Sequence, residues 1–270
     1  MNNNFISLIM KTSNKLKVAL IQSDLVWENP TENRKHFEDK INELDSNIDL
    51  IILPEMFTTG FTMQASNLAE TMEGKTIVWM QQLASQKESA ITGSIIITEN
   101  GNYFNRLLFV HPCGKIDFYD KKHLFTLANE HKTFSPGNKH ILINYKGWKI
   151  SPLICYDLRF PAWARNTDNY DLLLYVASWP TPRINAWNTL LKARAIENMA
   201  YTIGVNRVGT DANGYEYNGN SVAYDILGNC LGKNDNGKEI SLTIELDKEK
   251  QNKVRSKFGF LNDKDLFTFQ

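Results

Sequence analysis

The sequence is poor in cysteine. Its 270 residues include three cysteines, Cys113, Cys155 and Cys230, an odd number at wide spacing. Because a disulfide framework needs pairs, this set argues against one and favours a reducing compartment, so we expect a cytoplasmic protein. No CxxC pair occurs, and the histidines lack the spacing of metal ligands. We therefore expect no zinc site.

Glycine-rich phosphate loops are also missing. Neither GxGxxG nor GxxxxGK followed by Ser or Thr occurs in the sequence. These are the patterns by which dinucleotide-binding folds and P-loop proteins hold phosphate groups on backbone N–H groups. Their absence weighs against a nucleotide cofactor, and together with the missing metal pattern it leads us to expect no cofactor.

An excess of charge of one sign is missing as well. Thirty basic residues balance thirty acidic ones, which gives a formal net charge of zero. We therefore expect no long-range attraction to nucleic acid or to an anionic membrane. The partner that fits this composition best is a small-molecule substrate recognised by local contacts.

Long hydrophobic runs are lacking too. The longest, such as residues 172–177, fall far short of the ~20 residues that span a membrane. Residues 5–10 form a brief apolar patch without the basic start and the length of a secretory signal. We expect no membrane span, and we interpret residues 1–14 as an N-terminal extension.

What the sequence does contain is an alternation of short apolar runs and helix-like segments. Residues 17–22 and 50–54 flank residues 31–44, whose apolar positions have helical spacing, and Pro30 is a plausible helix start. A long helical segment is predicted over residues 187–201. This rhythm predicts strands that alternate with helices.

Hairpins interrupt that rhythm. Residues 100–102 (NGN) and residues 146–147 (KG) each join two strand-like runs. Residues 158–165 are expected to begin a helix. Because hairpins lie among alternating strands and helices, the sheets must be mixed, and the predicted fold is an α/β layered sandwich. No repeat or linker divides the chain, so we expect one domain over residues 15–270.

The segment LICYDLRFP (residues 153–161) places Cys155 at the end of an apolar strand, directly before Tyr156 and Asp157. A core position is the alternative, since free cysteine is among the most buried residue types. The strand-to-turn context favours a nucleophile elbow, in which the side chain is exposed and backbone N–H groups lie nearby. The other two cysteines lack that context.

Two further segments carry groups that such a thiol would need. The segment LIILPEMF (residues 50–57) brings Glu55 to a strand end directly after a proline, where a partly buried carboxylate can act as a general base. The segment YDKKHLF (residues 119–125) carries Lys121 and Lys122, of which only one can enter a site. A solvated glutamate and surface lysines are the alternatives. Cysteine, glutamate and lysine together indicate amide or nitrile chemistry.

A second carboxylate follows shortly after the lysines. Glu130 lies in the segment NEHKTF (residues 129–134). A carboxylate there could hold a buried lysine ammonium, whose charge would otherwise cost several kcal/mol. An exposed loop or helix position is the alternative.

The three motifs LIILPEMF, YDKKHLF and LICYDLRFP occur in the order typical of the nitrilase, or carbon-nitrogen hydrolase, superfamily, and the sequence resembles that family. Similarity extends from about residue 17 to the C-terminal FGFLNDKDLF, and HLFTLANEHKTFSPGN and SWPTPRINAW resemble its omega-amidase branch. The resemblance implies a four-layer αββα sandwich with two mixed sheets that commonly dimerises through helices. We therefore expect a homodimer.

The resemblance also implies roles for the candidate residues. Cys155 falls on the family's nucleophile, Glu55 on its general base and Lys121 on its lysine, the K of a K-x-H pattern. Glu130 matches the second glutamate of the family. The implied reaction is hydrolysis of the terminal amide of 2-oxoglutaramate or 2-oxosuccinamate through a thioester. The ammonium of Lys121 and the backbone N–H of Tyr156 would hold the oxyanion.

The implied substrate also carries a carboxylate. Arg183, in the segment WPTPR, is our candidate to bind it bidentately. Arg159 is the competitor, although we expect a bond from that side chain to Asp157 or other structural contacts. Trp179 and Phe125 are predicted to wall the pocket, and core positions are their alternative.

Two other interpretations stay open. The cysteine, glutamate and lysine do not select the acyl group, so another amidase, a carbamoylase or a nitrilase fits the same residues. A non-catalytic interaction module with a buried cysteine is the alternative from a different class.

Overall fold

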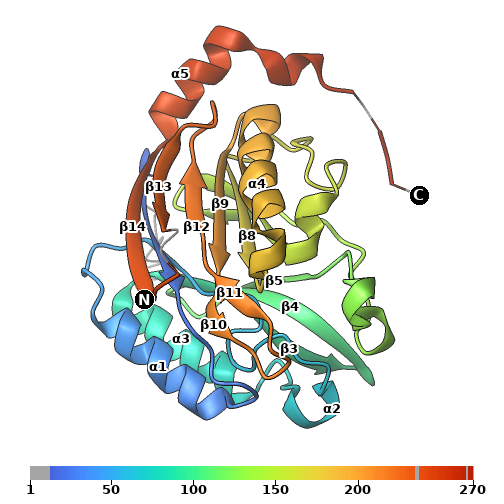
Figure 1. Ribbon diagram of the computed structural model, residues 1–270. Coiled ribbons are helices and arrows are strands. Elements are labelled where there is room, and N and C mark those ends of the chain that lie inside the picture. The colour runs from blue at the N-terminus through green and yellow to red at the C-terminus, as the bar shows by residue number, and fades with distance from the viewer. Residues whose placement is uncertain (1–12, 235–236, 266, 270) are drawn as a thin grey trace, which may run out of the picture.

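The computed structural model describes residues 13–234, 237–265 and 267–269 (Figure 1). Its main feature is a pair of six-stranded sheets packed face to face, with helices on the outer side of each sheet. The layers follow the order helix, sheet, sheet, helix. The predicted α/β sandwich with two mixed sheets is confirmed.

The first sheet has the strand order β14-β1-β2-β3-β4-β5. Its members are β1 (Lys15–Gln22), β2 (Leu50–Ile52), β3 (Ala90–Glu99), β4 (Asn102–Val110), β5 (Ile116–Asp120) and β14 (Ile240–Asp247). Strands β1, β2 and β3 pair in parallel, whereas β14, β4 and β5 pair antiparallel to their neighbours. The hairpin predicted at residues 100–102 is the connection between β3 and β4.

The second sheet has the order β13-β12-β9-β8-β7-β6. Its members are β6 (Ile143–Tyr145), β7 (Trp148–Ile154), β8 (Leu172–Ala177), β9 (Tyr201–Asn206), β12 (Ser221–Tyr224) and β13 (Cys230–Asn234). Strands β7, β8 and β9 are parallel, and the rest pair antiparallel. A separate two-stranded ribbon consists of β10 (Val208–Thr210) and β11 (Glu216–Asn218).

Helices cover both outer faces. Helices α1 (Pro30–Asn42) and α3 (Lys75–Lys87) lie side by side against the first sheet, and α4 (Ile184–Asn198) covers the second (Figure 1). The remaining α-helices are α2 (Ala65–Leu68) and α5 (Lys248–Phe258). The described residues also form short 3-10 helices: η1 (Thr126–Ala128), η2 (Glu130–Lys132), η3 (Cys155–Arg159), η4 (Thr181–Arg183) and η5 (Phe260–Asp263).

Strand β1 shows why the apolar runs of the sequence are continuous. Val18 and Leu20 point into the core between the two sheets, whereas Ala19 and Ile21 point into the core beneath α1 and α3. Successive side chains of a strand face opposite sides, so a sheet covered on both faces needs apolar residues at every position. The run at residues 17–22 is the sequence signature of that burial.

The start of α1 agrees with its sequence signal. Pro30 occupies the first turn, where its missing N–H costs nothing, and the side chain of Asn29 accepts a hydrogen bond from the Glu32 N–H at 3.2 Å. The Asn29 cap therefore places the beginning of α1 one residue before the predicted segment.

The prediction that residues 158–165 begin a helix is wrong. The chain forms the short η3 directly from Cys155 and leaves helical geometry at Phe160, whose φ is −113° and ψ is 87°. Pro161 explains this, because proline disfavours helical geometry in the residue before it and lacks an N–H. The sequence predicted neither helix α5 nor the β10–β11 ribbon. Helix α5 is highly polar and buries only Gln251, so it lacks an apolar pattern that would reveal it.

The N-terminal part of the chain is described from Ser13 onward, so most of the predicted extension lies outside the described residues. Trp148 Nε1 donates to the Ser13 carbonyl at 3.0 Å, and the Lys248 N–H donates to the Asn14 carbonyl at 2.8 Å. The boundary of the domain stays a prediction. Within the described residues, no helix is long and apolar enough to cross a membrane.

Candidate active site

Polar side chains from both sheets meet where several strands end. Lys121, Cys155 and Ser178 directly follow β5, β7 and β8, and Glu55 lies three residues after β2. The Ser178 N–H donates to Glu55 Oε2 at 2.8 Å, which joins a loop of the first sheet to a strand end of the second. A crevice at the carboxyl ends of parallel strands is a common place for a site in α/β proteins.

Cys155 sits at a sharp turn. Its φ is +43°, a left-handed conformation that non-glycine residues seldom adopt and that costs of order 1–3 kcal/mol. The Ile154 N–H donates to Asp157 Oδ2 at 3.0 Å and closes the turn from strand into η3. This is the elbow geometry expected from the sequence, and the thiol is partly exposed at a cavity.

Glu55 is fully buried and held on both oxygens. Oε1 accepts from Lys121 Nζ and from Asn105 Nδ2, each at 2.8 Å. Oε2 accepts from the Ser178 N–H at 2.8 Å. A carboxylate oxygen has two acceptor positions, so Oε2 retains one for a further donor. Glu55 is therefore oriented, and its Oε2 keeps a free lone pair.

Lys121 lies between two buried carboxylates. Its Nζ is 2.8 Å from Glu55 Oε1 and 3.0 Å from each Glu130 oxygen. Burial alone would lower the pKa of Lys121, but the charges of Glu130 and Glu55 raise it above its ordinary value, so the ammonium stays protonated. Burial raises the pKa of Glu130 despite the ammonium, and the nearby Glu55 charge raises it further.

The thiol of Cys155 faces the same charges. Burial raises its pKa well above the usual value, and the Glu55 carboxylate raises it further, while the Lys121 ammonium acts in the opposite direction. Burial and the Glu55 charge therefore favour the neutral thiol over the thiolate in the resting site.

Asn105 is a member of this cluster that sequence reasoning missed. It lies on β4, is buried, and donates through Nδ2 to Glu55 Oε1 at 2.8 Å and to Glu130 Oε1 at 3.4 Å. Its Oδ1 is buried and has no hydrogen-bond partner among the described residues. The signal in the sequence was an amide between Phe104 and Arg106 in a strand-like run, where a buried polar group is costly without a partner.

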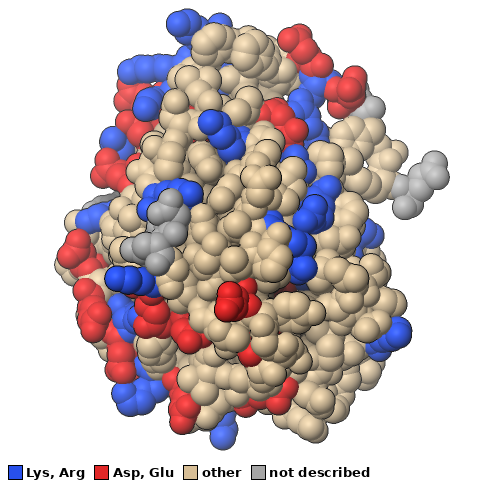
Figure 2. All heavy atoms as spheres, in the orientation of Figure 1, with Lys and Arg blue, Asp and Glu red and all other residues tan. Residues whose placement is uncertain are grey.

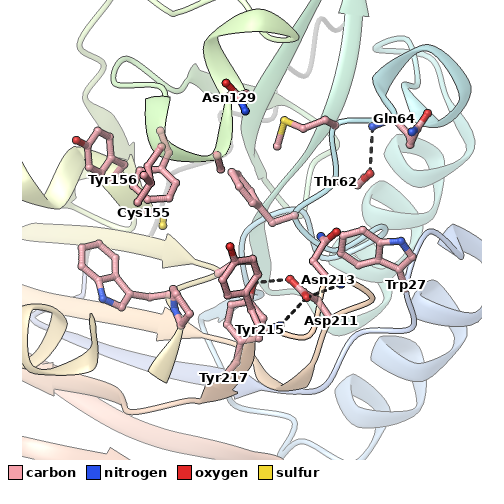
Figure 3. A pocket seen from close by; sticks show the side chains of 18 of the residues that line it. Trp27, Thr62, Gln64, Asn129, Cys155, Tyr156, Asp211, Asn213, Tyr215 and Tyr217 are labelled. Atoms are coloured by element: carbon pink, nitrogen blue, oxygen red, sulfur yellow. Dashed lines mark hydrogen bonds between the residues drawn. The ribbon is translucent and has the colours of Figure 1, made fainter. Parts of the chain in front are cut away.

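The thiol opens onto a cavity of about 800 Å³. Figure 3 shows Cys155 and Tyr156 on one side of it and Trp27 on the other, with Tyr215 and Tyr217 between them. Aromatic side chains and charged side chains both line the cavity: Trp27, Glu28, Phe61, Lys121, Phe125, Tyr156, Arg159, Trp179, Arg183, Asp211, Tyr215 and Tyr217.

The three residues predicted to bind the substrate all line this cavity. Arg183 lies with its Cζ 5.0 Å from the centre of the Phe125 ring, and Arg159 lies 5.0 Å from that of Trp179. Neither guanidinium forms an ion pair with a described carboxylate. The cavity lining therefore includes two guanidinium groups that lack acidic partners among the described residues, and guanidinium groups can bind carboxylates bidentately.

Of the two expectations for Arg159, the bond to Asp157 is wrong, whereas its contact with the Trp179 ring agrees with the expectation of other structural contacts. Asp157 is buried, and its four hydrogen bonds come from Tyr119, His123 and the Ile154 N–H. These donors fill both carboxylate oxygens, so the Arg159 side chain extends to the cavity instead.

The structure brings the four residues predicted for catalysis into one cluster: Glu55, Lys121, Glu130 and Cys155. Lys122 points away, with Nζ 5.4 Å from the centre of the Trp163 ring. Adjacent residues of an extended segment face opposite sides, which explains the division. In the part of the chain that the structure describes, no group of three or more His, Cys, Asp or Glu is arranged to hold a metal ion.

A four-layer αββα sandwich with a thiol, a buried carboxylate and a buried ammonium at the floor of a cavity defines a class of cysteine-dependent hydrolase. A family model described as carbon-nitrogen hydrolase matches residues 17–255. The chain belongs to the carbon-nitrogen hydrolase family, as the three motifs predicted.

Individual relatives narrow the comparison. The chain is 42% identical over 252 residues to omega-amidase YafV of Escherichia coli K12, and the alignment covers 93% of this chain and 98% of the relative. It is 31% identical over 261 residues to the 2-oxoglutaramate amidase of Bacillus subtilis, covering 94% of this chain and all of the relative, 100%. The predicted resemblance to the omega-amidase branch is confirmed.

Solved structures agree with the fold. The crystal structure of XC1258 from Xanthomonas campestris, a CN-hydrolase superfamily protein with an arsenic adduct in its active site, superposes with a TM-score of 0.93 at 38% identity, covering 95% of this chain and 99% of that one. Nit3 of Saccharomyces cerevisiae, from branch 10 of the nitrilase superfamily, gives 0.80 at 25% identity and covers 92% and 95%.

Proposed function

We propose that this protein is an omega-amidase that hydrolyses the terminal amide of 2-oxoglutaramate or 2-oxosuccinamate to the 2-oxo dicarboxylic acid and ammonia. The observation that carries the proposal is the Cys155 thiol beside the Glu55 carboxylate and Lys121 ammonium, facing a cavity with two unpaired arginines. Support for the substrate comes from the similarity to omega-amidases.

The first half of the reaction forms a thioester. Glu55 Oε2 takes the proton of the Cys155 thiol while the sulfur attacks the amide carbon, because the raised thiol pKa leaves little free thiolate. The carbonyl oxygen becomes an oxyanion. Lys121 and the backbone N–H of Tyr156, in the first turn of η3, hold this charge. Protonated Glu55 then gives its proton to the amide nitrogen, the C–N bond breaks, and ammonia leaves.

The second half releases the acid. Glu55, again a carboxylate, takes a proton from water as the water oxygen attacks the thioester carbon. The same two donors hold the second oxyanion. The C–S bond then breaks, and Glu55 returns the proton to the sulfur of Cys155. Glu130 holds the Lys121 ammonium in place throughout, also while Glu55 carries the proton, so the lysine acts as a fixed positive charge.

The test of this assignment is ammonia release from 2-oxoglutaramate by the wild-type protein and by Cys155→Ala, with a simple aliphatic amide, an N-carbamoyl amino acid and a nitrile as control substrates. We expect fast release from the oxo-acid amide by wild type and loss of turnover in a folded Cys155→Ala protein. Equal turnover in both proteins would overturn the chemistry. An inert oxo-acid amide beside an active control substrate would assign the protein to another nitrilase-superfamily activity.

The cavity wall supports a carboxylate site. We propose that Arg183 binds the substrate carboxylate and that Trp179 and Phe125 wall the substrate chain, with Arg159 as the second guanidinium in reach. Arg183→Met should raise KM by about 10- to 100-fold, the loss expected for a hydrogen bond between charged groups. Steady-state kinetics compare it with Arg159→Met and with Lys192→Met, which removes an exposed charge of α4. A larger KM increase in Arg159→Met would give Arg159 the role.

We further propose a cytoplasmic homodimer. The two exposed cysteines, Cys113 and Cys230, are free thiols, which suits a reducing compartment. Light scattering of the purified protein gives the molecular mass in solution. A mass near 31 kDa, that of the single chain, would contradict the dimer.

A further inference from the structure

A buried carboxylate lies behind the catalytic cluster, and the mechanism above does not use it. Asp157 is fully buried and follows Cys155 by two residues. Four donors fill its acceptor positions: Tyr119 OH at 2.8 Å and the Ile154 N–H at 3.0 Å on Oδ2, and the His123 N–H at 3.0 Å and His123 Nδ1 at 2.8 Å on Oδ1.

These donors belong to the two segments that carry the reacting groups. Ile154 directly precedes Cys155, whereas Tyr119 and His123 each lie two residues from Lys121. One carboxylate therefore bonds the elbow of the second sheet to the lysine segment of the first sheet. The distance from the Lys121 ammonium to the thiol depends on how these two segments are held together.

The two backbone N–H groups and the Tyr119 hydroxyl donate to Asp157, and the His123 ring donates in the tautomer that carries its proton on Nδ1. The oxygen of Tyr119 accepts from the Lys122 N–H at 3.2 Å and from Trp163 Nε1 at 3.0 Å, so its own proton is directed at Asp157. The His123 ring stacks on Phe160 at 3.6 Å between centroids with a 5° interplanar angle. The site requires an acceptor on both sides, and a carboxylate supplies it where an amide does not.

We propose that Asp157 is a positioning residue, which fixes the Lys121 segment against the Cys155 elbow so that the ammonium lies where the oxyanion forms. The proposal rests on the proposed function for the roles of Lys121 and Cys155. It does not make Asp157 a participant in proton transfer, because its four acceptor positions are occupied and it does not line the cavity. A purely structural role is the competing explanation.

The Asp157→Asn variant tests this positioning role. Asparagine has the size of aspartate, but its side-chain NH₂ group replaces an acceptor oxygen and faces two hydrogen-bond donors. We expect kcat to fall about 100-fold, as for an ångström-scale displacement of a catalytic group, with KM changed less than about threefold. Asp171→Asn is the matched control. Asp171 is also a buried aspartate and accepts from Lys149, Lys248 and Arg255. It lies at the opposite end of β8 from Ser178, about 20 Å away along the strand.

A second measurement does not depend on the amide substrate. Iodoacetamide alkylates thiols, and mass spectrometry of the peptides follows Cys155 separately, with the exposed Cys113 and Cys230 as internal references. In Asp157→Asn we expect Cys155 to react about tenfold more slowly, since a displaced ammonium no longer favours the thiolate. The two reference cysteines should keep their rates. This readout stands even if 2-oxoglutaramate proves not to be the substrate.

Tyr119→Phe provides a milder variant, because it removes one donor and leaves a carboxylate at position 157. We expect a smaller fall in kcat than in Asp157→Asn and a melting temperature close to that of Tyr145→Phe, which loses a buried hydroxyl bonded to the Asp49 carbonyl. If Asp157→Asn does not fold, Tyr119→Phe carries the test. The proposal is overturned if kcat and Cys155 alkylation change no more in the site variants than in Asp171→Asn and Tyr145→Phe.

Discussion

At the scale of single residues, the charges of the cluster explain its chemistry. Two carboxylates, Glu55 and Glu130, surround one ammonium, Lys121, so the cluster carries a net negative charge when the Cys155 thiol is neutral. Burial raises the pKa of both Cys155 and Glu130, and the Glu55 charge raises it further at each, whereas the Lys121 ammonium lowers it. When Glu55 takes the thiol proton, an oxyanion replaces its charge, so the net charge of the buried cluster does not change during attack.

Asn105 is the residue whose removal tests this arrangement most directly. Asn105→Ala removes a 2.8 Å hydrogen bond to the oxygen of Glu55 that also accepts from Lys121. Because hydrogen bonds to charged groups contribute about 1.5–3 kcal/mol, we predict that kcat falls about 10- to 100-fold. Steady-state kinetics on the amide substrate give the value.

The control for that prediction is Asn102→Ala, which removes an exposed asparagine from the same strand. It should keep wild-type kcat. If Asn105→Ala matches this control in kcat, the orientation of Glu55 does not depend on the amide.

At the scale of elements, α4 packs closely against the second sheet, which carries Cys155 and Ser178 directly after two of its strands. Gly204 on β9 lies beneath α4, and a Cβ added there would meet Leu191 Cδ1 at 2.5 Å and Trp187 Cζ2 at 2.6 Å. Protein interiors leave little room for an added methyl group at such distances. The missing side chain therefore lets α4 approach β9, the neighbour of β8 in the second sheet.

Gly204→Ala should be destabilised by overpacking. We predict a loss of about 1–3 kcal/mol in the free energy of unfolding, measured by urea denaturation. Leu191→Ala removes the side chain that the added methyl group would meet. The double variant should therefore lose less free energy of unfolding than the sum of the losses in the two single variants. Strictly additive losses would show that the glycine is not needed for this contact.

The pairing of β4 with β5 explains the position of Lys121 in the site. Strand β4 pairs with β5 over residues 106–110, and the Lys121 N–H donates to the Asn105 carbonyl at 3.0 Å, directly beyond that ladder. The register of two antiparallel strands thus places the lysine beside the asparagine that shares its carboxylate. A shift by one residue would turn Lys122 into the site instead.

At the scale of the whole molecule, the surface is mixed in charge. Figure 2 shows acidic and basic side chains interspersed over the face in view, in agreement with the formal net charge of zero. The long-range field is therefore weak, and the proposed recognition of a substrate carboxylate relies on short-range contacts with the arginines that line the cavity.

One surface contact joins parts of the molecule that are distant in sequence. Glu239, just before β14, accepts from Ser23 Oγ and the Asp24 N–H, each at 2.8 Å, and its carboxylate also contacts His36 and Lys40 of α1. Burial raises the pKa of Glu239, but these hydrogen bonds outweigh it and lower the pKa to about 2. The carboxylate form is favoured in the folded state.

This pKa predicts how stability depends on pH. A carboxyl group whose pKa is lower in the folded than in the unfolded state stabilises the protein above its unfolded value, here 4.5, and loses that contribution as the pH falls toward about 2. We predict that wild type exceeds Glu239→Gln in the free energy of unfolding near pH 7. Urea denaturation between pH 7 and pH 2.5 should show the difference shrinking below about pH 4.5. If the difference in the free energy of unfolding did not change with pH, the charge of Glu239 would not be its cause.

The sequence by itself determined the family, the layered fold and the identity of the principal candidates. Continuous apolar runs required sheets covered on both faces, and glycine and asparagine turns required hairpins, so a layered sandwich with mixed sheets followed from local rules. The arrangement of two such sheets in an αββα sandwich came from the family resemblance. The motif around Cys155 predicted the sharp turn at this residue, because an apolar strand that ends in a polar turn can be recognised from neighbouring residues alone. The roles of these residues remain for the kinetic tests above.

Only the tertiary structure decided which distant groups share the site. Asn105 and Ser178 reach Glu55 from different strands, and Arg159 points to the cavity because donors from two segments occupy Asp157. Such contacts depend on the register and spacing of strands far apart in the chain, which no local pattern encodes. The helix predicted over residues 158–165 does not form, because Pro161 disfavours helical geometry in the residue before it despite the helix-like composition of the segment.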